Sequence, residues 1–224
     1  MWVGAGNPLG EPIPIAEASD HIAGFGLLND WSARDIQGWE AAPLGPFLGK
    51  NFSTSVSCWV VTPEALAPFR MPQPPRPAGD PAPLPYLLDE TDQASGALDL
   101  ELEVHLLPQA RRLAGLPPVR LARSHARHMY WTPAQMIAHH TCGGCDLRPG
   151  DLIGTGTISG TEPDSLGSLL ELSEGGRKVV HVAEGLERRY LEDGDEVILS
   201  AYARRDGFIS IGLGECRGTV TPAR

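Results

Sequence analysis

The sequence predicts a mainly β protein with few helices, and three observations lead to this fold class. Residues 52–61 and 98–107 alternate apolar and polar side chains, which is typical of half-buried strands. Asp-Gly pairs, which favour hairpin turns, precede two more apolar stretches at residues 196–202 and 208–213. A length of 224 residues suits one large domain of all-β or mixed architecture. We therefore expect a single β-rich domain over residues 1–224.

Two further strands and a long loop follow from local composition. Residues 22–29 are apolar and interrupted by glycines, which indicates a buried strand. Residues 151–157 follow an Arg-Pro-Gly turn and predict another strand. Residues 69–85 are rich in proline, which favours an ordered extended loop or an inserted arm. We assign this arm to residues 69–97.

Helices are expected in two places. A short helix should begin at Ser32, because Ser32 and Asp35 have the spacing of a capping box. A longer helix should span residues 132–141. Thr132 would cap its N-terminus and Pro133 would occupy the first turn, where a missing N–H group does no harm.

Composition excludes several classes of partner. Apolar residues make up 42% of the chain and the mean hydropathy is −0.15, with no apolar stretch near the ~20 residues that span a bilayer. The first residues lack the basic and apolar regions of a signal peptide. With 28 acidic and 18 basic residues the net charge is −10, which argues against nucleic acid or membrane as a partner. A small anionic substrate is compatible with this charge, because a few Arg and Lys residues can bind it locally.

The cysteines predict a reduced, cytoplasmic protein, because four scattered thiols are too few for a disulfide scaffold. Cys142 and Cys145 form a C-x-x-C pair just after His139 and His140. A structural zinc site usually takes ligand pairs from two segments, and a redox pair needs a thioredoxin-like context. The sequence shows neither, so we expect a helix that ends in a Gly-rich turn with partly buried thiols.

The side chains best suited to catalysis lie within residues 29–54. Asp30 should stand at the carboxyl end of a strand, and Arg34 and Gln37 should share one face of the short helix. Lys50 and Thr54 are expected on the following strand, pointing to one side. The alternative is an ordinary surface ion pair between Asp30 and Arg34, with Lys50 exposed. The Gly-Pro-Phe-Leu-Gly segment directly before Lys50 favours a site, because a solvated lysine needs no such constrained backbone.

A second informative segment, residues 150–160, contains a Gly-Thr-Gly-Thr loop that includes Thr157. Such loops bring N–H groups and hydroxyls close to a ligand. The spacing matches neither a dinucleotide-binding fingerprint nor a phosphate-binding P-loop. Glu171 follows between leucines, as either an inward-facing carboxylate or an ordinary edge-strand glutamate.

These motifs, and their order along the chain, resemble the fumarylacetoacetase family. The matching segments are residues 10–14, 21–22, 29–37, 39–40, 43–50, 59–60, 83–87, 129–132, 139–140, 147–151, 156–160, 162–163, 193–197 and 212–218. The resemblance implies a mixed β-sandwich roll of the family's carboxyl-terminal type. It also implies metal-dependent hydrolysis of 4-fumarylacetoacetate, a diketo acid, to fumarate and acetoacetate. That reaction is the last step of tyrosine and phenylalanine catabolism. Mg²⁺ or Ca²⁺ is the implied cofactor and a homodimer the implied assembly.

The resemblance also implies roles for individual residues. Asp30 resembles a ligand of the divalent ion, with Lys50 and Thr54 at metal-associated positions. Glu171 resembles the acid that orients a catalytic histidine. The residues that resemble groups holding the substrate and stabilising its developing charge are Arg34, Gln37, Lys50 and Thr157.

Two departures leave alternatives open. Ala41 stands where the family commonly has a substrate-contacting tyrosine. The resemblance begins partway through a family chain, so the family's Glu-x-Glu metal ligands would precede Met1, with its catalytic histidine further upstream. Asp99, Glu101 and Glu103 are interpreted as a solvent-facing ladder rather than as replacements. The alternatives are an acylpyruvate hydrolase or decarboxylase/isomerase of the same superfamily, or a non-catalytic chain that keeps only the fold and dimer surface.

Overall fold

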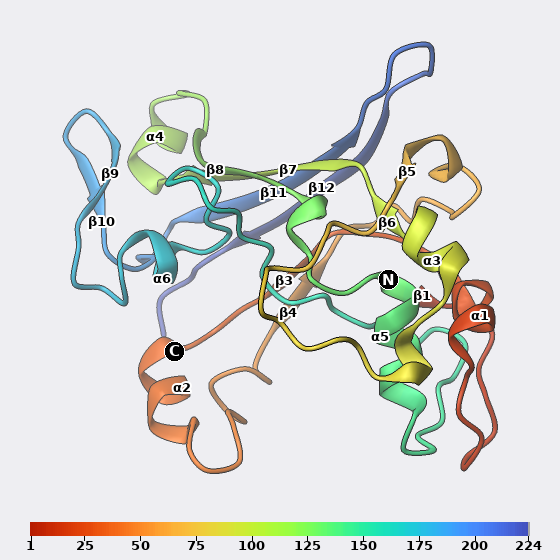
Figure 1. Cartoon of the computed structure of the whole chain (residues 1–224). Helices are drawn as coiled ribbons and strands as arrows, with labels where there is room; N and C mark the ends of the chain where they lie inside the picture. Colours follow the sequence, from red (N-terminus) through yellow and green to blue (C-terminus); the bar gives the residue numbers. More distant parts are fainter. Residues whose placement is uncertain (224) are drawn as a thin grey trace.

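A four-stranded antiparallel sheet forms the centre of the computed structural model, which describes residues 1–223 (Figure 1). Its strands lie in the order β12-β11-β7-β8. Their bounds are Leu100–Leu107 for β7, Val119–His125 for β8, Glu196–Ala203 for β11 and Ile211–Thr219 for β12. The predicted mainly β fold class is confirmed.

Four two-stranded pairs surround this sheet. They are β1 (Trp2–Val3) with β2 (Ile22–Gly24), β3 (Leu28–Asp30) with β4 (Thr54–Val56), β5 (Arg70–Met71) with β6 (Ala97–Leu98), and β9 (Val180–Ala183) with β10 (Leu186–Arg188). The β9–β10 hairpin and the region around α5 lie at opposite ends of the molecule (Figure 1).

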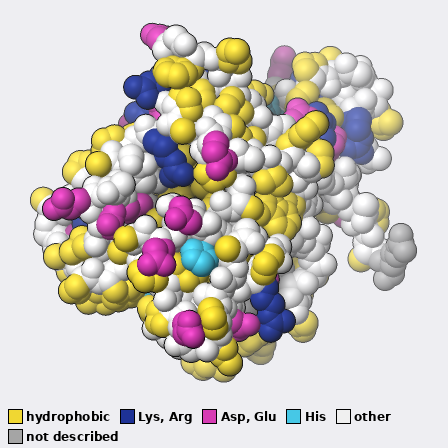
Figure 2. Space-filling model, turned by 90° about the vertical axis from the view of Figure 1, so that its right-hand side faces the viewer, with side chains coloured by type: hydrophobic (Ala, Val, Ile, Leu, Met, Phe, Trp, Pro, Cys, Tyr) yellow, Lys and Arg dark blue, Asp and Glu magenta, His cyan; other side chains and the backbone are white. Residues whose placement is uncertain are grey.

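The helices are short, and α5 packs against the first part of the chain. The α-helices are α1 (Ile15–Ala18), α2 (Arg34–Glu40), α3 (Glu90–Ser95), α4 (Gln109–Leu113), α5 (Pro133–Thr141) and α6 (Leu169–Leu172). Single 3₁₀ turns are η1 (Ser19–His21), η2 (Ala67–Phe69), η3 (Pro85–Leu87) and η4 (Ala126–His128). None of these helices is long and apolar enough to cross a membrane. On the side of the molecule near α1, α3 and α5, acidic side chains are interspersed with apolar ones (Figure 2).

The helix predicted over residues 132–141 is confirmed as α5, and its cap is the one the sequence indicates. The Thr132 hydroxyl accepts the Gln135 N–H at 3.1 Å, and the Gln135 side chain accepts the Thr132 N–H at 3.0 Å. Ile137 is fully buried in the main core, the cluster that also contains Phe69 and Leu98. This cap is local in sequence, which explains why it could be predicted.

The short helix after Ser32 exists, but the predicted capping box is wrong. The helix begins at Arg34, and its cap residue, Ala33, makes no side-chain bond. The Ser32 hydroxyl donates instead to the Asp30 carbonyl at 3.1 Å, and the Asp35 carboxylate accepts the Ile36 N–H at 2.8 Å. Ser32 therefore stabilises the turn that leaves β3 and not the helix.

Strand prediction succeeded in the central sheet and was only partly right elsewhere. β7 and β11 confirm the alternation at 98–107 and the stretch at 196–202, whereas β12 begins only at Ile211. The segment 22–29 divides into β2 and β3 because its two halves pair with different partners, and within 52–61 only β4 is a strand. The strand predicted at 151–157 is wrong.

In that last segment a single bridge joins Leu152 to Trp2, and the following residues are extended loop. Chain segments that lack a continuous neighbour cannot form a ladder, however apolar they are.

The acidic ladder is only partly the predicted solvent face: Asp99, just before β7, is 40% exposed, whereas Glu101 and Glu103 on β7 are half-buried under arginines. Glu101 bonds to Arg123 across the β7–β8 pair and to Arg204 at 3.0 Å. Glu103 lies 3.4 Å from Arg120. The hydrogen bond from Arg123 is the main cause that lowers the pKa of Glu101.

The proline-rich segment is an ordered extended loop held against α5. The Gln73 amide donates to the Tyr130 carbonyl and to the Gln135 side chain, both at 2.9 Å. Further along the proposed arm, η3 and α3 restore regular structure before β6.

The C-x-x-C pair follows α5 in a turn with Gly144 at positive φ, as expected for a helix ending in a Gly-rich turn. Both of its thiols are exposed, so the expectation of partly buried thiols is wrong. The Cys145 sulfur lies 3.4 Å from Nε2 of His140.

Candidate active site

A large cavity of about 1420 Å³ lies between the β3–β4 pair, the central sheet and the 152–158 loop. Of the residues predicted to form a site, five contribute to its lining: Asp30, Arg34, Lys50, Thr54 and Thr157. Gln37 and Glu171 do not line it. Gln37 instead contacts Arg34 and Glu171 contacts Ser168, and both of these partners belong to the lining. The five lining residues therefore share one cavity, and that they act together as a site stays a prediction.

Asp30 and Thr54 lie directly opposite each other in the β3–β4 pair, so their side chains share one face. Lys50 approaches from the turn before β4, and its Nζ lies 2.9 Å from Oδ2 of Asp30. The prediction that Lys50 lies on the same strand as Thr54 is wrong, because β4 begins only at Thr54. The turn still places both side chains in the lining of the large cavity. Because both members of the pair are half exposed, its contribution to stability is small, and its value lies in placing an ammonium at the cavity.

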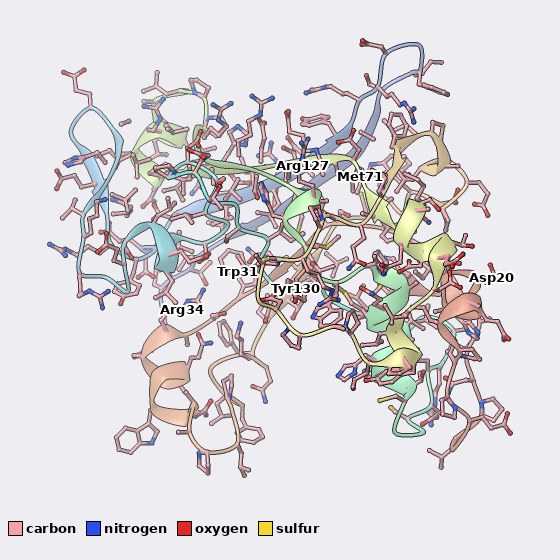
Figure 3. The ribbon with its side chains drawn as sticks, in the orientation of Figure 1. Asp20, Trp31, Arg34, Met71, Arg127 and Tyr130 are labelled. Carbon is pink, nitrogen blue, oxygen red and sulfur yellow. The ribbon has the colours of Figure 1, made fainter. Side chains whose placement is uncertain are left out.

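Arg34 stands where the chain leaves the β3 end for α2 (Figure 3). Its Nη1 donates to Oε1 of Gln37 at 2.8 Å, one helical turn later. The shared helix face predicted from the spacing is confirmed, and the hydrogen bond between the two side chains is a further finding. Gln37 thereby orients the guanidinium, whose remaining N–H groups stay available to the cavity.

Glu40, at the end of α2, anchors the turn before Lys50, which sequence reasoning missed. Its carboxylate accepts the backbone N–H groups of Phe47, Leu48 and Gly49 at 2.7, 3.1 and 3.0 Å. These bonds, led by those from Gly49 and Phe47, lower the pKa of Glu40. The anchored segment ends one residue before Lys50. A glutamate ahead of a Gly-Pro-x-x-Gly run was the available signal.

Replacing Glu40 by Gln should loosen this turn and displace the Lys50 ammonium. We expect kcat/KM of the active protein to fall about ten- to hundredfold, because small misplacements of a catalytic group are costly. Hydrogen exchange at the Phe47 to Gly49 amides should speed up in the same variant. The pKa of Glu40 is lower in the folded protein than in the unfolded chain. The anchor is therefore fully present at pH values above the usual pKa of a glutamate, and it is lost as the pH falls through the lowered pKa. Unchanged amide exchange in Glu40→Gln would contradict the anchoring role.

Glu171 supports the Gly-Thr loop from behind. It lies in α6, not in a strand, and accepts hydrogen bonds from the hydroxyls of Ser159 and Ser168, both at 2.7 Å. The Ser159 hydroxyl in turn accepts the Gly167 N–H at 3.0 Å. This small polar network fixes the loop two residues after Thr157. The predicted role of Glu171 in orienting a histidine stays a prediction, since its hydrogen bonds within residues 1–223 are to serines.

The donors of this chain do not by themselves fit a divalent ion. Mg²⁺ and Ca²⁺ take six or more oxygen ligands, commonly with several carboxylates. Here Asp30 and Thr54 offer one carboxylate and one hydroxyl, and Lys50 adds a positive charge on the same carboxylate. Within residues 1–223 no group of three His, Cys, Asp or Glu side chains is placed to hold a metal. The metal roles of Asp30, Lys50 and Thr54 therefore stay predictions.

The fold and the side chains that line the large cavity are those of a hydrolase family, which comparison with known proteins identifies. The chain belongs to the fumarylacetoacetate (FAA) hydrolase C-terminal family, whose model matches residues 2–221.

Within that family the chain is similar to curated fumarylacetoacetases. It is 50% identical over 223 residues to the one from Homo sapiens, covering 100% of this chain and 51% of that protein. It is 50% identical over 221 residues to the one from Oryza sativa (99% and 49%) and 49% identical over 223 residues to the one from Dictyostelium discoideum (98% and 49%). The chain spans about half the length of these curated relatives.

A solved structure shares the fold. A candidate HpcE protein from Mycobacterium smegmatis aligns with a TM-score of 0.52 at 21% identity, covering 99% of this chain and 56% of that one. The likeness confirms the fold type expected from the family.

Proposed function

We propose that this chain supplies the charge-stabilising part of a fumarylacetoacetase active site, which hydrolyses 4-fumarylacetoacetate to fumarate and acetoacetate. The observation that carries the proposal is the joint placement of the Asp30–Lys50 pair and Arg34 at one large cavity. The similarity to fumarylacetoacetases over the whole chain supports the choice of substrate.

Hydrolytic cleavage of a carbon–carbon bond requires a carbanion leaving group. Water adds to the ketone and gives up a proton, the tetrahedral oxyanion collapses, and the acetoacetate fragment departs as an enolate that is protonated on carbon. Lys50 and Arg34 are the cationic groups suited to stabilise the oxyanion and the enolate. Asp30 keeps the Lys50 ammonium in place, and Gln37 does the same for Arg34. Thr157 offers a hydroxyl to the substrate from the facing loop.

The group that accepts the proton from water is not identified by these side chains. Among residues 1–223 no histidine lines the large cavity. Mg²⁺ or Ca²⁺ as cofactor, a homodimer, a cytoplasmic location and a role in tyrosine catabolism are further proposals that rest on the resemblance.

Ala41 favours testing a second substrate class. It is exposed at the end of α2, where the family commonly presents a tyrosine. Ala41 does not line the large cavity as described for residues 1–223, so this lining offers no counterpart of the family's tyrosine, which is compatible with an acylpyruvate as substrate.

The deciding experiment offers fumarylacetoacetate and acetylpyruvate separately to the full natural polypeptide and identifies the products by chromatography. We expect fumarate and acetoacetate from the first, with a higher kcat/KM than for the second. Faster release of acetate and pyruvate from acetylpyruvate would support the acylpyruvate hydrolase alternative. No turnover of either substrate, with or without added Mg²⁺ or Ca²⁺, would overturn the proposal in favour of a non-catalytic protein.

A further inference from the structure

A second, smaller cavity of about 420 Å³ lies between the proline-rich loop and the start of α5. The chain segment 129–133 separates it from the large cavity: Met129 and Pro133 line the large one, whereas Tyr130 and Trp131 line the small one. Figure 3 shows Tyr130 at this dividing turn. The small cavity shares neither Arg34 nor Lys50 with the candidate active site. Its volume is within the range of small-molecule sites.

Among the described residues that line this cavity, Arg76 is the one arginine, and there is no lysine, aspartate or glutamate. Two aromatic rings pack against its guanidinium. Its Cζ lies 4.5 Å from the centroid of the Tyr130 ring and 4.4 Å from that of the Trp131 ring. Rings engage the face of a guanidinium, so the N–H groups at its edge stay free to donate. The two rings thus hold the Arg76 guanidinium in position through its face, and the N–H donors at its edge remain for a ligand.

One of these donors has no acceptor. Nη2 of Arg76 is buried and makes no hydrogen bond within residues 1–223. A buried donor without an acceptor is costly, and more so when the group is charged. Asp80 is not this acceptor: within residues 1–223 no hydrogen bond joins Nη2 of Arg76 to its carboxylate, which accepts the Tyr130 hydroxyl at 2.6 Å. The position calls for an anionic oxygen from outside the chain.

The remaining lining selects what carries that oxygen. Leu84, Leu87 and Met136 present apolar surface, and Tyr86 closes one side with its hydroxyl 2.8 Å from Nδ1 of His139. An inorganic anion would leave this surface without contacts, whereas a short alkyl or aryl chain would cover it.

We propose that this cavity is a binding site for a small carboxylic acid with an apolar body, whose carboxylate pairs with Arg76 while its chain contacts the leucines and Met136. The planar guanidinium matches a carboxylate in shape and charge. The ligand would enter beside the exposed Leu84.

The test titrates the protein with hexanoate and, separately, with uncharged hexanamide, and follows the indole N–H signal of Trp131 by NMR. Hexanoate should shift this signal saturably and bind more tightly than hexanamide. In Arg76→Gln the affinity for hexanoate should fall about ten- to hundredfold, as expected for loss of a charged hydrogen bond, while the affinity for hexanamide stays unchanged. The unchanged amide affinity would show that the cavity keeps its shape.

Arg34→Gln is the matched control, because it removes a guanidinium from the large cavity only; it should leave hexanoate binding at Trp131 unaltered. Three results would overturn the proposal. One is equal affinity for hexanoate and hexanamide, which would mean that only the apolar chain of the ligand is bound and that the carboxylate does not pair with Arg76. The second is an equal loss of both ligands in Arg76→Gln, which makes Arg76 a clamp for the loop. The third is loss of the Trp131 shift in Arg34→Gln, which places the carboxylate in the large cavity.

Discussion

Replacing Lys50 by Ala is expected to lower kcat of the active protein by about 10²–10³-fold, which corresponds to about 2.7–4 kcal/mol of lost transition-state stabilisation. The ammonium is held by Asp30 at 2.9 Å and faces the cavity, so it is organised before the reaction begins. Charge on the substrate grows as the oxyanion and the enolate form, and a fixed cation stabilises these states more than the ground state. We therefore expect the loss mainly in kcat rather than in KM, measured by steady-state kinetics.

The sequence offers a matched control, because its only other lysine is Lys178. That side chain is exposed, lies 3.9 Å from Glu174 and does not line the large cavity. Lys178→Ala should keep the native kcat. Near-native kcat in Lys50→Ala would remove Lys50 from the catalytic group and with it the central support for the proposed hydrolase.

Replacing Arg188 by Ala should produce the largest loss of stability that we expect from a single polar substitution. Arg188 donates to Asp195 through Nε at 2.8 Å and Nη2 at 2.9 Å, and Asp195 also accepts the Glu192 N–H at 2.9 Å. The Asp195 side chain is only 1% exposed. Its hydrogen bond is the leading cause that raises the pKa of Arg188. Without Arg188 a carboxylate remains buried and unpaired, which should lower the free energy of unfolding by about 3–5 kcal/mol.

Urea unfolding followed by circular dichroism measures this loss. Arg217→Ala is the control, since Arg217 bonds to Glu215 at 2.7 Å on an exposed surface and should cost less than about 1 kcal/mol. Adding Asp195→Asn to Arg188→Ala should recover part of the lost free energy of unfolding, because the buried, unpaired carboxylate is then replaced by a neutral amide. A loss below about 1 kcal/mol in Arg188→Ala would mean that the β9–β10 hairpin is not held to β11 by this pair.

Most of the patterns that the sequence predicted correctly have a short sequence range. The cap at Thr132 and the shared helix face of Arg34 and Gln37 each involve residues three apart. The same spacing failed at Ser32, where the helix begins later than expected and has no side-chain cap. The alternation in β7 succeeded because that strand has long neighbours on both sides. The same reasoning failed at 151–157, where the apolar stretch finds only an isolated bridge to Trp2.

The sequence by itself determined the fold class and the family and indicated which residues around Asp30 line one cavity, because periodicity and motif order can be recognised from neighbouring positions. Only the tertiary structure decided how turns close and which distant groups meet. The Glu40 anchor and the Arg188–Asp195 pair each close a turn of seven to nine residues, whereas the Arg76 cavity joins residues far apart in the sequence. Such contacts depend on how turns close and how segments pack, and the free energies of these arrangements are set by burial and hydrogen bonding across the whole chain rather than by any local pattern.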